Sequence, residues 1–100
     1  MIGVFVNFQF EDSDNFNADK LRAIAEKAQE KFTGMPGLRS KAFTIDASKQ
    51  RAVNFYIWES EQTARNFYSD AMLEQVSGLY GVAPTLEFVE IAELVDNHNR

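Results

Sequence analysis

Two stretches of the chain place amide side chains beside aromatic ones at every second position. They are Phe5, Asn7 and Gln9 in the first stretch, and Asn54, Tyr56 and Trp58 in the second. Apolar walls with a few convergent polar groups are typical of small-molecule pockets. A buried amide or phenol without a hydrogen-bond partner costs about 1–3 kcal/mol, and water or a small ligand would supply that partner. The pattern therefore predicts a pocket for a small ligand.

Several other kinds of chemistry lack the residues that they need. The chain has no cysteine, which excludes thiol catalysis, disulfides and zinc–thiolate sites. Its single histidine, His98, lies near the end of the sequence, where we expect no catalytic role, and a Ser-His-Asp triad is therefore not expected. No glycine-rich phosphate loop occurs, and the segment that begins Asp12-Ser13-Asp14 departs from a calcium loop at its later positions. We therefore expect no hydrolase, no nucleotide-dependent enzyme and no metal site.

The charge of the chain bears on its partners. The net charge is −5, from 15 acidic and 10 basic residues. Sequence-independent nucleic-acid binding and docking on anionic lipid both need clustered positive charge, so neither nucleic acid nor membrane is expected as a partner. No apolar run approaches the ~18 residues of a membrane span. The first residues lead into a strand pattern rather than a signal peptide, so we expect a cytoplasmic protein.

Hydrophobic periodicity predicts the elements that must position these side chains. Strands are expected over residues 2–10, 38–45, 51–58 and 85–95, and helices over residues 18–32 and 61–68, with a third, short helix that follows Asp70 and is closed by Gly78 and Gly81. Asn17, Ser60 and Asp70 are the expected N-caps of the three helices. The order is that of a ferredoxin-like βαββαβ fold with one further short helix, in which a four-stranded antiparallel sheet carries helices on one face. No linker interrupts the sequence, so one α+β domain is expected over residues 1–100.

The two faces of this sheet pose a folding problem, because the helices can cover only one of them. The apolar alternation of Val53, Phe55 and Ile57 predicts that these residues face the helices. The amide and aromatic residues would then lie together on the uncovered face, and a large exposed patch of this kind is unusual on a monomer. A second copy packed about a two-fold axis would cover it and bury on the order of 1,200–2,000 Å². We therefore expect a homodimer.

Two segments of the sequence resemble a known family. They are Pro36-Gly37-Leu38-Arg39-Ser40-Lys41-Ala42-Phe43, and Tyr56-Ile57-Trp58-Glu59-Ser60-Glu61 followed by Ala64 and Phe67. Together with the order of the elements, they resemble the dimeric α+β barrel superfamily, and within it the YdhR-like monooxygenases. One departure is that Val53-Asn54 stand where that family often has two glycines, so that side chains would narrow or re-line the pocket.

The resemblance implies a homodimeric α/β barrel with one pocket per subunit. It also implies oxygenation of a small aromatic phenol or quinol without metal, flavin or any other cofactor. An electron-rich phenolate can pass an electron to O₂, so the protein need only bind it, help to deprotonate it and exclude water. Two alternatives stay open: a non-enzymatic protein that binds a small hydrophobic molecule, and proton chemistry of the isomerase or dehalogenase type. Haem-degrading members of the superfamily need a histidine near the second helix, and residues 61–80 contain none.

The resemblance also assigns candidate roles to the residues singled out above. Asn7 and Tyr56 are the candidate catalytic residues, Asn7 to orient a phenolic oxygen and Tyr56 to relay a proton. Candidate substrate-binding residues are Phe5, Gln9, Lys41, Asn54 and Trp58. Lys41 would stabilise a phenolate. The alternative for the aromatic and amide residues is packing and hydrogen bonding at the dimer interface.

Overall fold

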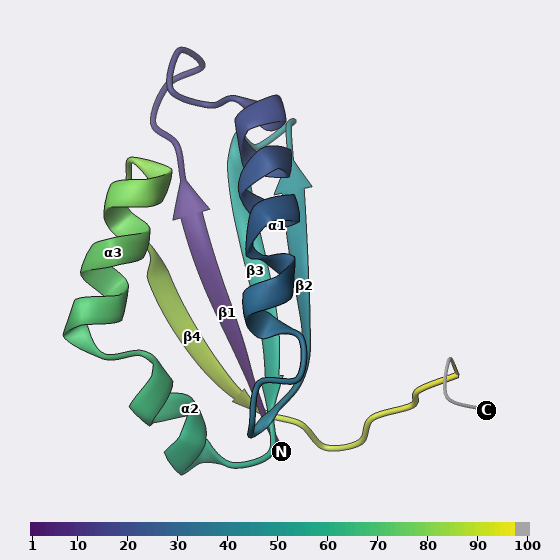
Figure 1. Ribbon diagram of the computed structural model, residues 1–100. Coiled ribbons are helices and arrows are strands. Elements are labelled where there is room, and N and C mark those ends of the chain that lie inside the picture. Colours follow the sequence, from purple (N-terminus) through teal and green to yellow (C-terminus); the bar gives the residue numbers. More distant parts are fainter. Residues whose placement is uncertain (98–100) are drawn as a thin grey trace.

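A four-stranded antiparallel sheet is the centre of the fold. The computed structural model describes residues 1–97. The sheet has the strand order β2-β3-β1-β4 (Figure 1). Its strands are β1 (Ile2–Gln9), β2 (Leu38–Asp46), β3 (Arg51–Trp58) and β4 (Thr85–Glu90). The predicted α+β class with a ferredoxin-like sheet is confirmed, whereas the dimeric barrel stays a prediction.

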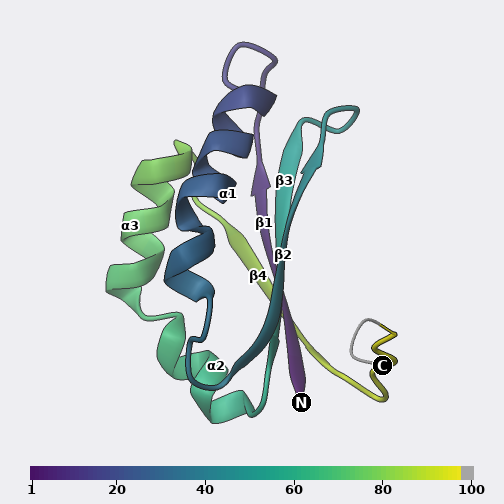
Figure 2. The same cartoon turned by 45° about the vertical axis from the view of Figure 1, so that its right-hand side comes forward.

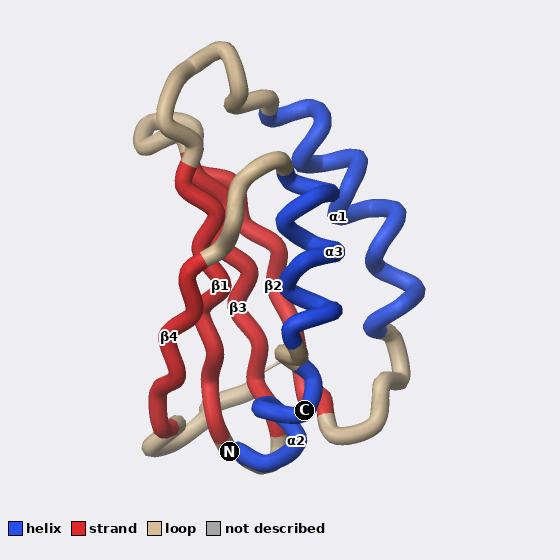
Figure 3. The backbone as a smooth tube through the Cα atoms, turned by 90° about the vertical axis from the view of Figure 1, so that its left-hand side faces the viewer, coloured by secondary structure: helices blue, strands red, loops and turns tan. Residues whose placement is uncertain are grey.

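Three helices lie on one face of the sheet. They are α1 (Ala18–Phe32), α2 (Glu61–Phe67) and α3 (Asp70–Tyr80). Figures 2 and 3 show α1 and α3 running alongside each other across this face, with α2 at the end where β3 finishes. Over the described residues, the opposite face carries no helix. We call the covered side the helix side and the other the open face.

Side-chain caps decide where the helices begin. Asn17 accepts a hydrogen bond from the Lys20 amide, as predicted for α1. Ser60 caps α2 in the same way. The cap of α3 is Ser69, which accepts from the amide of Met72, so the prediction of Asp70 was wrong by one residue. The helix then continues to Tyr80 and ends at Gly81, whose φ of 88° is costly for other residues.

The register between the central strands overturns one prediction. Val4 lies opposite Tyr56 and Val6 opposite Asn54, and directly opposed residues in an antiparallel pair point to the same face. Asn54, Tyr56 and Trp58 therefore lie on the helix side, because Val4 and Val6 are in the core. Val53, Phe55 and Ile57 lie on the open face, with Phe5, Asn7 and Gln9. The prediction that all six amide and aromatic residues share one face was wrong.

The physical reason is that the polar groups of Trp58 and Asn54 find partners beneath the helices. The indole nitrogen of Trp58 donates a hydrogen bond to the hydroxyl of Tyr68, at 3.0 Å. The amide nitrogen of Asn54 donates to the hydroxyl of Tyr80, at 3.1 Å. Once its polar atom is paired, a large aromatic side chain contributes more buried surface than valine does. The Tyr and Trp face is therefore the better core.

Strand β4 is shorter than predicted, because it ends at Glu90 and not at Val95. Its neighbour is β1, which begins at Ile2. The amide of Ile91 still donates to the carbonyl of Met1, at 3.2 Å, but beyond that point β4 has no strand to pair with. The chain then leaves the sheet (Figure 1).

Candidate functional site

A cavity of about 490 Å³ lies between the helices and the sheet. Its walls come from α1 and α3, and its floor comes from β1, β2 and β3. The floor residues are Val6, Phe8, Lys41, Phe43, Asn54 and Tyr56. The volume falls within the range of about 300–1,000 Å³ that is typical of ligand pockets. We call this space the helix-side cavity.

Lys41 enters the helix-side cavity from β2 and lies among aromatic rings. Its ammonium nitrogen is 3.4 Å from the ring centre of Phe32, 4.1 Å from that of Phe43 and 4.3 Å from that of Tyr56. These rings attract a cation. Burial opposes the charge more strongly and, together with the positive charge of Lys31, lowers the pKa of Lys41 to about 7. At neutral pH this lysine therefore can act both as a base and as a cation.

Tyr56 stands next to Lys41 on the cavity floor and is a neutral phenol. Burial raises the pKa of Tyr56 far above its ordinary value, and the neighbouring Tyr68 and Tyr80 add to this effect. Among residues 1–97 the Tyr56 hydroxyl has no hydrogen-bond partner, although Tyr68 and Tyr80 both accept one. The group is therefore a donor that is available to a ligand rather than a base.

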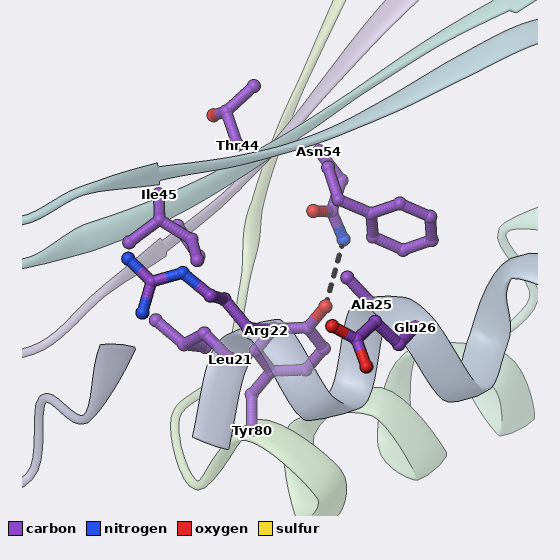
Figure 4. Close-up of a pocket in the computed structure, with 10 residues that line it drawn as sticks. Leu21, Arg22, Ala25, Glu26, Thr44, Ile45, Asn54 and Tyr80 are labelled. Atoms are coloured by element: carbon purple, nitrogen blue, oxygen red, sulfur yellow. Dashed lines mark hydrogen bonds between the residues drawn. The ribbon is translucent and has the colours of Figure 1, made fainter. Parts of the chain in front are cut away.

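Asn54 lies farther along the same floor and is 4% exposed. Figure 4 shows its amide directed at the hydroxyl of Tyr80, which comes from the end of α3. The Tyr80 ring is stacked on Phe8, with centroids 3.7 Å apart. A second cavity, of about 190 Å³, adjoins this hydrogen bond and opens beside Arg22. The Asn54–Tyr80 pair therefore lies between the two cavities and fixes the orientation of the Asn54 amide.

Trp58 lies behind the cavity and does not line it. The side chain is 1% exposed and lies parallel to Tyr56, with ring centres 5.9 Å apart and planes at 9°. Its hydrogen bond to Tyr68 fixes the indole. Trp58 therefore holds Tyr56 in place and is not positioned to contact a ligand in the cavity.

Three of the predicted site residues lie on the open face, away from this cavity. Phe5 is 36% exposed and its ring lies against Phe55, with centroids 4.6 Å apart. The side-chain oxygen of Asn7 is buried without a hydrogen-bond partner among the described residues. Gln9 donates from its amide to the carbonyl of Lys49, at 2.9 Å, and so fastens the hairpin between β2 and β3. The predicted juxtaposition of Asn7 with Tyr56 is therefore wrong, because the sheet separates them.

Several residues of the cavity were not predicted from the sequence. Phe32 and Tyr80 carried no signal beyond their aromatic character, and Phe43 was noted only as part of the segment that resembles the family. Lys20, Lys27 and Lys31 on α1 are exposed and line the mouth of the cavity. Their spacing could have indicated this, because residues 20, 27 and 31 share one stripe of a helix.

Other kinds of site are not seen in the described part of the chain. Residues 1–97 contain no cluster of three or more acidic or histidine side chains that could hold a metal ion. None of their helices combines the length and the apolar character that crossing a bilayer requires. His98, for which no catalytic role was expected, lies outside the described residues.

The family model described as "Putative mono-oxygenase ydhR" matches residues 4–84. This range includes all seven candidate residues and both walls of the helix-side cavity. None of the curated proteins compared with the sequence matches it significantly.

Solved structures share the fold at low sequence identity. A monooxygenase from the gene ActVA-Orf6 of Streptomyces coelicolor, solved with the ligand nanaomycin D, is 24% identical, with a TM-score of 0.68. The match covers 94% of this chain and 89% of that one. SnoaB, a cofactor-independent oxygenase from Streptomyces nogalater, is 10% identical, with a TM-score of 0.65, and the match covers 94% and 95% of the two chains. At these identities the likeness establishes the fold alone.

Proposed function

Because the chain belongs to the ydhR family of monooxygenase-like proteins, we propose that it is a cofactor-independent monooxygenase of a small aromatic phenol or quinol. The observation that carries this proposal is the helix-side cavity, in which Lys41, with a pKa of about 7, lies among aromatic rings beside Tyr56. The oxygenase from Streptomyces nogalater, which has this fold and is described as cofactor-independent, supports the choice of chemistry.

Proton transfer to Lys41 is the first step that we propose. A phenol in the cavity would lie against Phe32 and Phe43, with its hydroxyl directed at the Lys41 nitrogen. The neutral amine takes the phenolic proton and becomes an ammonium, which then pairs with the phenolate. The attraction between the ammonium and the phenolate is strong at short distance and offsets the cost of burying the two charges.

The oxygen step follows from the electron-rich ring. The phenolate passes one electron to O₂, and the two radicals combine so that a carbon–oxygen bond forms. The peroxide anion takes the proton back from the Lys41 ammonium, and the resulting hydroperoxide loses water as its O–O bond and the C–H bond of the same carbon break, which leaves a carbonyl group on the ring. Substrate and O₂ thus give a quinone and water, and the substrate supplies every electron.

Two cavity side chains are placed to assist this sequence. The Tyr56 hydroxyl, held neutral by its raised pKa, donates a hydrogen bond to the developing oxygen anion. The Asn54 amide, fixed by Tyr80, orients a second oxygen of the substrate. Trp58 supports Tyr56 from behind. The catalytic assignments thus move to Lys41, Tyr56 and Asn54.

For the open face we propose that a second copy of the chain covers it, which makes the protein a single-domain homodimer. Phe5 and Phe55 are partly exposed there, and the Asn7 oxygen has no partner in residues 1–97. A facing sheet would bury the rings and supply a hydrogen bond. Light scattering is expected to find a species of twice 11.4 kDa, and a monomer at micromolar concentration would overturn this part of the proposal.

Oxygen consumption tests the enzymatic proposal. Purified protein with a metal chelator is offered anthrone and naphthohydroquinone in an oxygen electrode, and we expect consumption above the spontaneous rate with one quinone formed per O₂ and no hydrogen peroxide released. Lys41→Met should abolish the excess, whereas the matched variant Lys49→Met, which changes a lysine outside the cavity, should retain it. Ligand binding without oxygen consumption across the panel would instead favour the non-enzymatic binding protein.

A further inference from the structure

The lysines of this protein are concentrated at one place. The chain has five, and Lys20, Lys27, Lys31 and Lys41 all line the helix-side cavity. The exception is Lys49, in the β2–β3 hairpin. In the part of the chain that the structure describes, none of the 15 acidic residues lines this cavity. A protein with a net charge of −5 therefore has a ligand cavity whose charged groups are all positive.

Helix α1 separates these charges from the apolar interior. Lys20, Lys27 and Lys31 are exposed and follow one stripe of the helix, at the mouth of the cavity. Ile24 and Ala28 also line the cavity and are partly buried. Since long lysine stems extend along apolar surface and keep the ammonium in water, the cations lie at the edge and the hydrocarbon lies within.

None of these lysines forms an ion pair with a described residue. Ion pairs join Arg22 to Asp19, Arg51 to Asp46 and Arg65 to Glu61, and none of them includes a lysine. The opposite wall, from α3, adds Met72, Gln75, Val76, Leu79 and Tyr80, which are uncharged. The mouth of the cavity therefore carries an unbalanced positive charge above an apolar interior, and a ligand with a negative group would complement it.

We propose that the substrate is an aromatic acid, whose rings lie against Phe32, Phe43 and Tyr56 and whose carboxylate is held at the lysine-lined mouth. This rests on the proposed function for the choice of cavity and of an aromatic ring, but not on any oxygen chemistry. Lys41 lies deepest of the four lysines and meets the phenolic end of the ligand, and the α1 lysines meet its carboxylate. The acidic group thus sets the direction in which the ring enters.

Calorimetric binding under nitrogen tests the inference without turnover. The probes are a hydroxynaphthoic acid and the naphthol that lacks only its carboxyl group. Exposed ion pairs are individually weak, so three lysines together predict that the acid binds about tenfold more tightly at low salt. The preference should shrink as salt is added. Equal affinities, or tighter binding of the naphthol, would overturn the inference.

Substitutions that remove positive charge test whether the α1 lysines cause the preference for the acid. We expect the triple variant Lys20→Gln, Lys27→Gln and Lys31→Gln to lose most of the preference for the acid, while Lys49→Gln keeps it. The single variant Lys27→Glu, which needs only one surface change, should reduce the preference at least threefold by the same rule. A preference that survives in the triple variant, or that Lys49→Gln reduces equally, would show that the cavity lysines do not hold the carboxylate.

The two proposals fail separately. If the acid is preferred through the α1 lysines but no oxygen is consumed, the oxygenase is overturned and the ligand class stands. If oxygen is consumed with the naphthohydroquinone but no preference for acids is found, the ligand class alone is overturned. Octanoate serves as the apolar acid without a ring, and binding as tight as that of the hydroxynaphthoic acid would overturn the aromatic part of the inference.

Discussion

The two faces of the central strands differ although they are made from the same two segments of chain. On the helix side, Val4, Val6 and Phe8 are at most 1% exposed, and the opposing β3 residues are equally enclosed. On the open face, Phe5 is 36% exposed. The helix side thus has a complete core with a cavity in it, and the open face has apolar rings that the described residues leave partly uncovered.

Hydrogen bonding explains why Asn54 and Trp58 of β3 lie on the helix side. Trp58 and Asn54 can be buried because their polar atoms are paired, and the helix side supplies Tyr68 and Tyr80 for that purpose. The open face offers the Asn7 oxygen no such partner within residues 1–97. A purely apolar alternation, such as that of Val53 and Phe55, therefore does not by itself identify the side that the helices cover.

The largest contrast between the faces is expected in stability. Trp58→Ala removes an enclosed aromatic side chain and its hydrogen bond, and it should lower the free energy of unfolding by about 3–5 kcal/mol. Measured on the monomer, Phe5→Ala should cost clearly less, since the ring is 36% exposed within a single chain. Unfolding in urea followed by circular dichroism measures both, because the only tryptophan is lost in the first variant. Equal losses would contradict the distinction between the faces.

The sequence was sufficient to predict the helices and strands, but not to predict which face of β3 the helices cover. The helix over residues 18–32 and the strand over 51–58 were predicted to the residue, because caps and turn residues act locally. The face of β3 depends on its register with β1 and on partners from Tyr68 and Tyr80, which lie far along the chain. The prediction therefore placed Phe5, Asn7 and Gln9 in the same pocket as the β3 residues, although the sheet separates the two sets.

Substitutions on the two faces of the sheet should also differ in their effect on activity. Tyr56→Phe removes a donor to the oxygen anion, and loss of such a donor lowers turnover about 100-fold or more. Asn7→Ala changes the amide on the other side of the sheet and should leave ligand affinity in the cavity unchanged, while it weakens the proposed dimer. Oxygen consumption and light scattering distinguish the two effects. A loss of ligand binding in Asn7→Ala would restore the shared pocket predicted from the sequence.

The pH dependence of the reaction should sharpen the role of Lys41. Its neutral amine is the proposed base, so turnover should rise with pH through about 7 and then level off. The charged neighbour that contributes to this pKa is Lys31 on α1. Lys31→Gln should move the midpoint upward, because a positive charge near the ammonium has been removed. If the pH midpoint of turnover does not change in Lys31→Gln, the titrating group is not Lys41 in the cavity.

Lys41 should also make the free energy of unfolding depend on pH. The pKa of Lys41 is about 7 in the folded protein against an ordinary value of 10.5, so the unfolded chain binds more protons between these limits. The free energy of unfolding should therefore rise with pH across that window, and less so in Lys41→Met. Urea titrations at several pH values measure this slope. If Lys41→Met leaves this slope unchanged, other titratable groups cause the pH dependence of stability.

The smallest difference is expected between two tyrosine hydroxyls on the helix side, those of Tyr80 and Tyr68. Tyr80→Phe leaves the Asn54 amide without its partner, and Tyr68→Phe does the same to the Trp58 indole. Each variant should lose about 1–3 kcal/mol of stability, since a buried donor becomes unpaired. Only Tyr80→Phe should also weaken ligand binding, because Asn54 lines the cavity and Trp58 does not. If both weakened binding equally, the core as a whole would set the shape of the cavity, and the Asn54–Tyr80 pair would have no separate role in orienting the substrate.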